Sequence, residues 1–338
     1  MRRHPRLRRL EPPPKAGRSQ VPAGEERVLR RRIRSVASTQ KITRAMELIA
    51  ASRIVRAQQA MVAARPYAER MEDVIRELAA TPEAQRHWIF AGGGDRSLVV
   101  VLGADRGLCG AFNTSVHRVA EELLGELARK GPPSEVIAVG RKVKGYFRFR
   151  GRAVAESLEG FTDRPSFEDA QKVVEAISRE LETGTIGQIY LVSTHFLSVG
   201  TQRAEKRRLV PLDLPERKDK PTDGVGHEPG GTTIFEFEPE PDAILDRLLP
   251  RWLEAEVYLA LLESAASFHV SQQRAMKAAT DNADDLIKTL RRQMNRARQD
   301  SITTEITEIS GGAEALRQAE SGEQDSGRPD IYVYPNAS

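Results

Sequence analysis

The apolar positions that follow Gly24 repeat with the period of a helix that pairs with another helix. Apolar residues fall at alternating steps of three and four along this segment: Ile54, Ala57, Met61, Ala64, Ala68, Met71, Ile75 and Leu78. A repeat of about 3.5 residues predicts a left-handed coiled-coil seam. Between Gly24 and Gly92 there is no glycine, and proline occurs only at Pro66 and Pro82. We therefore predict an N-terminal coiled-coil helix over residues 25–85, kinked at Pro66 because proline removes a backbone donor.

Two polar residues interrupt the start of this stripe. Leu29, Ile33 and Val36 extend it towards the N-terminus, but the next positions in register are Gln40 and Thr43. We therefore expect the seam to lose its apolar character over this part of the helix.

A second long helix is predicted at the other end of the chain. It begins at Pro241, a residue tolerated at a helix start, and ends at the pair Gly311–Gly312, so we assign it to residues 241–312. At about 1.5 Å per residue, each of the two helices is about 80–90 Å long. Two helices of matched length around a compact middle predict an antiparallel coiled coil with a domain inserted at one end. The seam residues expected from both helices are Ile54, Met61, Met71, Ile75, Leu286, Leu290, Ile302 and Ile306.

The middle of the chain, residues 96–240, follows a different pattern. Short apolar runs typical of strands (LVVVLG, EVIAVG, QIYLVST and IFEFE) occur here together with two amphipathic helices at residues 115–130 and 166–182. This order predicts an α/β domain with a largely parallel sheet. Residues 216–231 are rich in Gly, Pro and charged residues and predict a mobile surface loop.

Composition separates the two ends of the chain from the rest. Residues 1–24 are basic and rich in proline, which predicts a disordered lead, and residues 313–338 are expected to form a flexible tail. The net charge is +4, with the arginine surplus concentrated near the N-terminus. No apolar run approaches the roughly 20 residues of a membrane span, and the N-terminus lacks the apolar core of a signal peptide. A single cysteine, Cys109, excludes a disulfide within the chain and fits a reducing compartment.

The turn ADRGLCGAFN, residues 104–113, has the outline of a phosphate-binding loop without its full chemistry. Its last glycine is followed by Ala, Phe and Asn, where a P-loop needs Lys and then Ser or Thr. The glycine spacing also departs from the dinucleotide-binding pattern G-x-G-x-x-G. We interpret the turn as structural, braced by an ion pair between Asp105 and Arg106.

No other group of residues predicts catalysis or metal binding. The six histidines are scattered, with no pair at the i, i+4 spacing of a helical zinc site. Cys109 is expected to be a small buried residue rather than a nucleophile. We therefore expect no catalytic, cofactor-binding or metal-binding residues, and no cofactor.

Longer motifs at both ends of the chain resemble the γ subunit of the F-type ATP synthase. They are RRRIRSVASTQKITRAMELIAASR at residues 30–53 and AMKAATDNADDLIKTLRRQMNRARQDSITTEITEISGGAEAL at residues 275–316. Three shorter motifs fit the same family in the same order, at residues 65–71, 104–113 and 248–258. The resemblance covers about residues 25–316.

The resemblance implies a long antiparallel coiled coil of the terminal helices with an inserted Rossmann-like α/β domain. In this family the coiled coil is a shaft inside the ring of α and β subunits. The α/β domain contacts the ε subunit and the c-subunit rotor ring. The subunit is non-catalytic and couples ion flow through the membrane sector to ATP synthesis or hydrolysis in the ring. It lies at the cytoplasmic face of the bacterial cell membrane, attached only through its partners, and binds no nucleic acid.

Five residues, carried over by motif, are expected to contact the catalytic ring. Met46 lies in KITRAMELIA, where the family's shaft faces the lever loop of the catalytic subunits. The other four lie in RARQDSITTEITEI and are Arg298, Gln299, Thr303 and Glu305.

The sequence departs from the family pattern in two places. Gln272 and Gln273 stand where the family commonly has arginine, and Arg274 is the candidate replacement. The basic lead precedes the segment at which family members usually start, so we expect the native chain to begin at Val21 rather than at Met1.

Two other classes of function compete with this interpretation. A coiled-coil protein could use the arginine-rich N-terminal region to bind nucleic acid, with binding that weakens steeply as salt increases. A nucleotide-dependent enzyme built on the middle domain would need a phosphate loop, which the turn at residues 104–113 does not provide.

Overall fold

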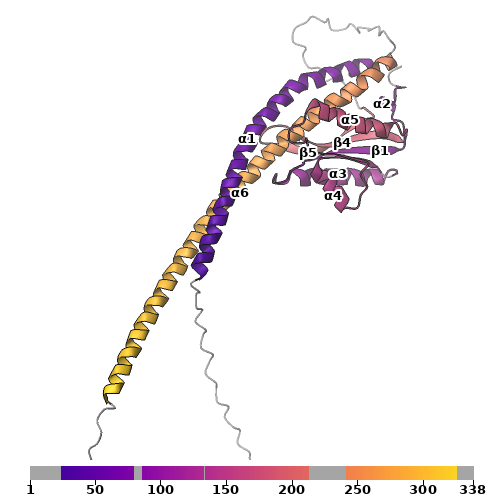
Figure 1. The fold of residues 1–338 in the computed structure, drawn as a ribbon. Helices are drawn as coiled ribbons and strands as arrows, with labels where there is room; N and C mark the ends of the chain where they lie inside the picture. The colour runs from indigo at the N-terminus through magenta and orange to yellow at the C-terminus, as the bar shows by residue number, and fades with distance from the viewer. Residues whose placement is uncertain (1–23, 80–85, 133, 213–240, 326–338) are drawn as a thin grey trace, which may run out of the picture. The chain divides into compact units, whose positions relative to one another are not determined.

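The computed structural model describes residues 24–79, 86–132, 134–212 and 241–325. These residues form two compact units, a smaller one from residues 24–40 and 281–325 and a larger one from residues 41–280. The two longest helices, α1 (Gly24–Ala79) and α6 (Pro241–Asp325), contribute to both units (Figure 1).

The terminal helices differ in length more than the sequence pattern predicts. α1 contains 56 residues and passes through Pro66 without ending, and its later part is curved (Figure 1). α6 contains 85 residues, so the expectation of matched lengths is wrong. The predicted stop at Gly311–Gly312 is also wrong, because α6 continues to Asp325. Neither glycine has a positive φ, and the cost of about 1 kcal/mol for each is tolerated within a run, AEALRQAE, that favours helix.

In the smaller unit, α1 and α6 lie antiparallel. Leu29 packs against Leu290 and Ala297 in one buried cluster. Further along α1, the side-chain amide of Gln40 donates a hydrogen bond to a carboxylate oxygen of Asp284 over 3.5 Å. Increasing residue numbers in α1 are therefore matched by decreasing numbers in α6.

The larger unit contains a second antiparallel stretch, between residues 41–79 of α1 and 241–280 of α6. The hydroxyl oxygens of Thr43 and Thr280 lie 2.8 Å apart, and Ile54 shares a buried cluster with Ala266 and Val270. Thr43 is one of the two polar residues that interrupt the predicted stripe, and it has a polar partner on α6, as Gln40 has in the smaller unit. Such polar pairs restrict the register in which two helices can pack.

The residues predicted for the seam divide into buried and exposed groups. Ile54, Met61, Ile75 and Leu290 are buried, and Met71 is partly buried against the core of the larger unit. The other three are wrong as seam residues, because they are 48%, 47% and 63% exposed: Leu286, Ile302 and Ile306.

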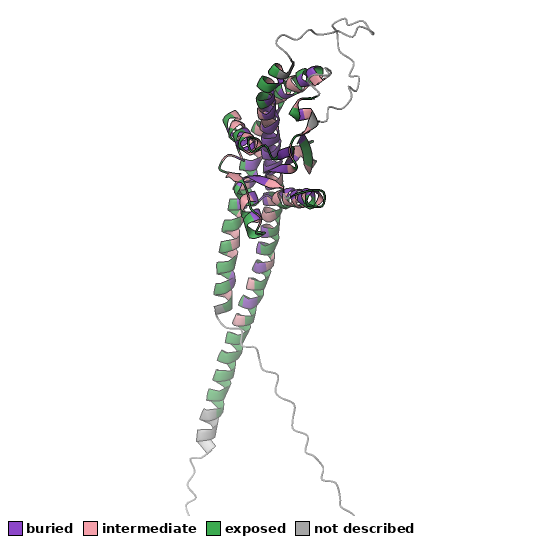
Figure 2. Cartoon of the chain, turned by 90° about the vertical axis from the view of Figure 1, so that its right-hand side faces the viewer, coloured by how far each residue is buried: buried purple, intermediate pink, exposed green. Residues whose placement is uncertain are grey.

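Two different causes explain these three errors. Near Leu286 the buried positions are Ala283, Ile287 and Leu290. Their steps of four and three are as helical as the predicted steps, so the sequence alone did not distinguish Leu286 from its neighbour. Ile302 and Ile306 follow Ala297, the last α6 residue in the buried cluster with α1, and Figure 2 shows this part of α6 as exposed.

The inserted domain contains a five-stranded sheet in the order β3-β2-β1-β4-β5. Its strands are β1 (Arg96–Leu102), β2 (Glu135–Val139), β3 (Glu156–Leu158), β4 (Ile186–Phe196) and β5 (Gln202–Val210). β1 pairs in parallel with β2 and β4, β2 pairs in parallel with β3, and β5 is antiparallel to β4. The predicted, largely parallel sheet is therefore confirmed. The predicted strand IFEFE, the loop at 216–231 and the lead before residue 24 lie outside the described residues.

Helices cover both faces of the sheet (Figure 1). The helices besides α1 and α6 are α2 (Trp88–Ala91), α3 (Phe112–Ala128), α4 (Arg141–Phe149) and α5 (Phe167–Leu181). Val99 and Val101 of β1 pack in one cluster with residues of α3 and α4. Leu98 and Val100 pack in another with residues of α5 and α6. Because both faces are buried, β1 is a continuous apolar run rather than an alternating one.

Asp105 fixes the glycine-containing turn that follows β1. Its carboxylate accepts hydrogen bonds from the backbone N–H groups of Arg141, Gly160 and Thr162, at 3.0, 2.9 and 3.1 Å, and from the Thr162 hydroxyl. Burial raises the pKa of Asp105, but these hydrogen bonds outweigh it and hold the pKa below its ordinary value. The expected ion pair with Arg106 is wrong, because the Arg106 Nε atom lies 3.7 Å from a carboxylate oxygen of Asp163 instead.

Buried carboxylates of α6 connect this helix to α1 and to the sheet. One Glu263 oxygen lies 2.7 Å from Nδ1 of His195 on β4, and the other lies 3.8 Å from the guanidinium of Arg65 on α1. Two turns earlier in α6, a carboxylate oxygen of Glu256 lies 2.6 Å from the guanidinium of Arg207 on β5. Burial raises the pKa of Glu256, and the charge of Arg207 opposes that rise. These contacts tie three separate parts of the chain together within the larger unit.

Replacing Asp105 with asparagine is expected to destabilise the chain. Asp105→Asn turns an amide donor towards backbone N–H donors, and we expect a loss of about 2 kcal/mol in the free energy of unfolding. A carboxyl whose pKa is lowered by folding stabilises the folded state at pH values above its unfolded-state pKa, and this stabilisation is lost in acid. The difference in unfolding free energy between the variant and the unaltered chain should therefore shrink as the pH falls below the ordinary pKa of 3.8. Urea unfolding at several pH values measures both effects. The exposed residue Asp95, changed to asparagine, is the control, and a loss as large in this variant contradicts the assignment.

Removing the cation beside Glu256 is expected to destabilise the chain in a pH-dependent manner. Arg207 is about half exposed, so we expect Arg207→Gln to cost on the order of 1 kcal/mol of unfolding free energy. A carboxyl whose pKa is raised by folding favours the folded state at low pH and loses that effect as the pH rises. The loss should therefore be larger at about pH 8 than at about pH 5. Arg203→Gln, at an exposed pair on the same strand, is the control. An equal loss for Arg207→Gln at both pH values argues against the Glu256 explanation.

Candidate functional site

An apolar stripe on α1 has no partner among the described residues. It consists of large side chains that are 52–65% exposed: Ile42, Leu48, Ile49, Val55 and Val62. Leu48, Val55 and Val62 are spaced by seven residues, as are Ile42 and Ile49, so the stripe consists of two rows along the helix. Both rows lie away from the side that presents Ile54 and Met61 to α6. Several large exposed apolar side chains on one helix are typical of a protein–protein contact.

Met46 lies at the border of this stripe. Its side chain is partly buried, and at about 100° per residue its position on the helix falls between Ile42 and the buried residues Thr43 and Ala50. The structure therefore places Met46 where a partner on the exposed face could reach it.

A second exposed stripe runs along α6 in the smaller unit. Its members are 47%, 63%, 73% and 68% exposed: Ile302, Ile306, Ile309 and Leu316. Their spacings of four, three and seven residues place them on one side of the helix. Within the described chain, no residue packs over them.

The four polar residues predicted as ring contacts flank this α6 stripe. All four are exposed. Helical geometry places Arg298 and Glu305 along one border of the stripe, and Gln299 and Thr303 along the other. The Thr303 hydroxyl donates to the backbone carbonyl of Gln299 over 2.9 Å, and Glu305 accepts a bond from Ser301. An apolar centre with a polar border is the usual composition of an interface. Met46 belongs to the larger unit and these four to the smaller one.

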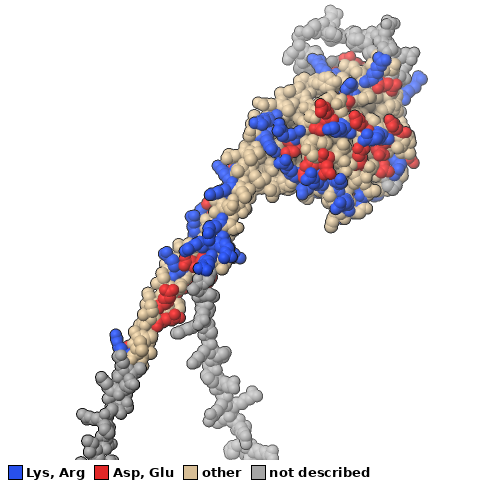
Figure 3. Space-filling view, in the orientation of Figure 1, with Lys and Arg blue, Asp and Glu red and all other residues tan. Residues whose placement is uncertain are grey.

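Arginines gather on the N-terminal part of α1, as Figure 3 shows. Arg27, Arg30, Arg31, Arg32 and Arg34 are all exposed. Arg30 forms an ion pair with Glu26 over 2.5 Å. Another side of this segment presents Leu29 to α6, so all of these arginines except Arg32, which lies beside Leu29, form one charged face of a paired helix.

Neither a metal site nor a membrane-spanning helix is found among the described residues. No group of three or more His, Cys, Asp or Glu side chains is placed to hold a metal ion. None of the described helices has a stretch both long and apolar enough to cross a membrane.

Comparison with known proteins identifies the family of the chain. A family model described as ATP synthase matches residues 25–316. The ATP synthase gamma chain of Frankia casuarinae is 48% identical over 299 residues, which cover 87% of this chain and 98% of the relative. The gamma chain of Thermobifida fusca is 45% identical over 302 residues, which cover 88% and 98%. These similarities extend over nearly the whole length of both relatives.

Solved structures share the fold at low sequence identity. A chain from the mitochondrial ATP synthase of Euglena gracilis, in a structure of OSCP, F1 and the c-ring, matches with a TM-score of 0.61 and 16% identity. The match covers 93% of this chain and 100% of that chain. A chain from the central stalk and c-ring of the Tetrahymena thermophila enzyme matches with a TM-score of 0.51 and 21% identity, covering 70% and 99%. No comparison favours a nucleic-acid-binding protein. The chain belongs to the ATP synthase gamma-chain family, whose members are central-stalk subunits of the F-type enzyme.

Proposed function

We propose that this chain is the rotor shaft of its ATP synthase and performs no catalysis itself. The observation that carries the proposal is the antiparallel pairing of α1 with α6 together with the exposed apolar stripe on each helix. Pairing supplies a stiff element, and the stripes supply surfaces for the catalytic α and β subunits that surround it.

Rotation has an effect on a ring only if the sides of the shaft differ. A surface that contacts every conformation of a neighbouring subunit equally shifts no equilibrium. The sides of α6 do differ at one level, since Ile302 and Ile306 are exposed apolar residues whereas Thr304 and Glu308, on the opposite side, are polar. Each catalytic subunit would therefore meet a different surface at each orientation of the shaft.

The contact residues follow from the borders of the two stripes. We assign Met46, on α1, and Arg298, Gln299, Thr303 and Glu305, on α6, to contacts with the catalytic ring. Support comes from the exposure of the four α6 residues and from the partial burial of Met46 beside an exposed stripe.

The paired helices must transmit torque without separating from each other. Moving one charge across 100 mV supplies about 2.3 kcal/mol, so several ion steps must accumulate before one ATP is released. Close packing of Ala266 and Val270 against Ile54 suits this load, as do the ion pairs that Glu263 forms with α1 and β4.

The inserted domain is assigned to the remaining partners. We place the ε subunit and the c-subunit ring against it and the chain at the cytoplasmic face of the cell membrane, held there only through these partners. Support comes from the similar folds in structures described as central stalk with c-ring and as OSCP, F1 and c-ring.

Removing the α6 stripe is expected to weaken assembly without unfolding the chain. In the double variant Ile302→Ser with Ile306→Ser, both side chains are exposed in the free chain, so its unfolding free energy should change by less than about 0.5 kcal/mol. Burial of each isoleucine in the ring contributes about 1.5–3 kcal/mol, so affinity for the ring of α and β subunits should fall at least about tenfold. Titration of the variant into purified ring measures this. Thr304→Ala with Glu308→Gln, on the opposite side of α6, is the matched control, and equal weakening by the control contradicts the role of the stripe.

Purification of the native complex tests the rotor assignment itself. The chain should be recovered from membranes as a single copy beside the large nucleotide-binding subunits, and ATP hydrolysis should require those subunits. Hydrolysis of ATP by the purified chain alone, or recovery of the chain with nucleic acid instead of this complex, would overturn the proposal.

A further inference from the structure

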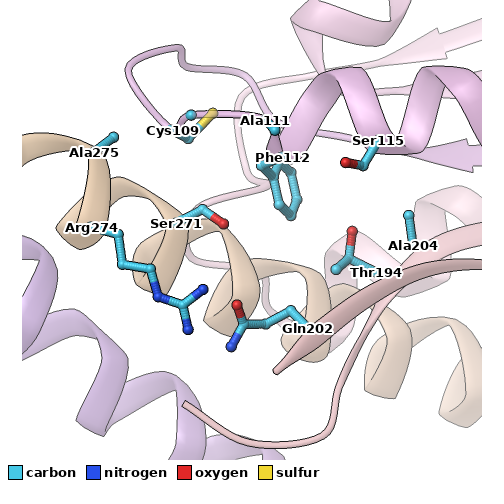
Figure 4. A pocket seen from close by; sticks show the side chains of 11 residues that line it. Cys109, Ala111, Phe112, Ser115, Thr194, Gln202, Ala204, Ser271, Arg274 and Ala275 are labelled. Carbon is cyan, nitrogen blue, oxygen red and sulfur yellow. The ribbon is translucent and has the colours of Figure 1, made fainter. Parts of the chain in front are cut away.

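A cavity of about 410 Å³ lies beside the turn that follows β1, within the larger unit. Its walls come from the turn and the start of α3, from β4 and β5, and from α6 (Figure 4). In the strand order β3-β2-β1-β4-β5, β1 is central, β2 and β3 lie on one side of it, and β4 and β5 lie on the other. The order of the strands therefore reverses between β1 and β4. Ligands of open α/β sheets bind outside the carboxyl ends of the strands at such a reversal point. The cavity lies at this place.

The start of α3 borders the cavity through Ala111, Phe112 and Ser115. α3 begins at Phe112, and its N-cap residue, Ala111, provides no side-chain hydrogen bond. The N–H groups of Phe112 and Ser115 donate to backbone carbonyls, so the Ser115 hydroxyl is the donor that this helix offers to the cavity. The start of a helix also carries partial positive charge, which favours an anion beside it.

Arg274 of α6 supplies a full positive charge to the opposite wall. Its guanidinium donates to the backbone carbonyls of Val199 and Gly200. These are neutral groups, and within the described chain Arg274 has no carboxylate partner. Among the described residues, those that line the cavity include no aspartate or glutamate. The positive charge is therefore not neutralised by a lining residue.

A buried hydroxyl without a partner independently indicates a missing ligand. Thr194 of β4 is only 5% exposed, and its Oγ1 atom has no hydrogen-bond partner within the described chain. Figure 4 shows this oxygen directed into the space between Phe112, Ser115 and Gln202. Buried hydroxyls are normally bonded, so one directed into a cavity is explained by a group that occupies the cavity.

The remaining lining residues are compatible with an anion. Burial raises the pKa of the Cys109 thiol, so this side chain is neutral near pH 7 and does not repel negative charge. Leu108, next to it, has a φ of 61°, in the left-handed region that residues other than glycine rarely adopt. Strained backbone of this kind persists where the surrounding structure enforces it, often at ligand-binding turns.

We propose that this cavity binds a small tetrahedral oxyanion, a phosphate group. The hydroxyls of Thr194 and Ser115 and the guanidinium of Arg274 are its donors. The phosphate is either free in solution or the terminal group of a nucleotide. The missing P-loop lysine and Ser/Thr do not conflict with this, because they serve a nucleotide triphosphate with its metal ion, whereas the donors here suit a single phosphate. The inference does not depend on the rotor role.

The single cysteine provides a direct measure of occupancy, since Cys109 lines the cavity. Inorganic phosphate, titrated into the purified full-length chain, should slow the reaction of Cys109 with a thiol reagent several-fold. Sodium chloride at matched ionic strength should leave the rate unchanged, and calorimetry should give a dissociation constant that agrees with the protection. A parallel titration with ADP shows whether the bound phosphate is free or belongs to a nucleotide. Protection of Cys109 at lower concentrations of ADP than of phosphate indicates a nucleotide, and protection only at equal or higher concentrations indicates free phosphate.

Two variants and a matched control connect binding to the named donors. Arg274→Gln should weaken phosphate binding at least tenfold. Thr194→Val keeps the shape of the side chain and should weaken binding several-fold, with stability to urea retained. Lys277→Gln, at an exposed lysine on the next turn of α6, should bind as the unaltered chain does. Absence of protection and of heat with both phosphate and ADP overturns the proposal, and so does equal weakening in Lys277→Gln and Arg274→Gln.

Discussion

Packing of α1 against α6 is the constraint on which the rest of this structure depends. The two helices come from opposite ends of the chain, and they meet antiparallel in both units. Their pairing brings Thr43 to Thr280, across more than two hundred intervening residues, with their hydroxyl oxygens 2.8 Å apart. The segment between them can therefore fold as a complete α/β domain without interrupting either helix.

The chain uses two sets of apolar residues on the same helices for different purposes. Ile54 and Met61 are buried against α6 and stabilise the chain itself. Leu48 and Val55 lie on another side of α1 and remain exposed. A helix that serves both its own fold and a surrounding assembly needs apolar residues on more than one side, which explains why α1 does not have a simple amphipathic pattern.

Much of the fold could be predicted from the sequence because its signals are local. The apolar runs of β1, β2 and β4 and the periodicity of α3 and α5 identified these elements. β5 was missed because QRAEKRR, at the edge of the sheet, is mostly polar, and β3 because it contains only three residues. The ties of Glu263 to Arg65 and His195 were not predictable, since residues so far apart in sequence carry no local signal. The difference between Leu286 and Ile287 required knowing the rotation of α6 relative to α1. The residues proposed to contact the ring follow from the family resemblance, and their chemistry alone would not have indicated them.

The end of α6, over which no other described residue packs, has a consequence for how the protein is made. Ile306, Ile309 and Leu316 are exposed there, and in this unit α6 extends well beyond the residues that pack with α1. Single helices with so few tertiary contacts open easily, and exposed apolar surface adheres to other apolar surface. A newly synthesised copy that has not met its partners is therefore open to proteolysis and aggregation at this end. If this surface is the one proposed to meet the ring, balanced synthesis of the subunits protects it.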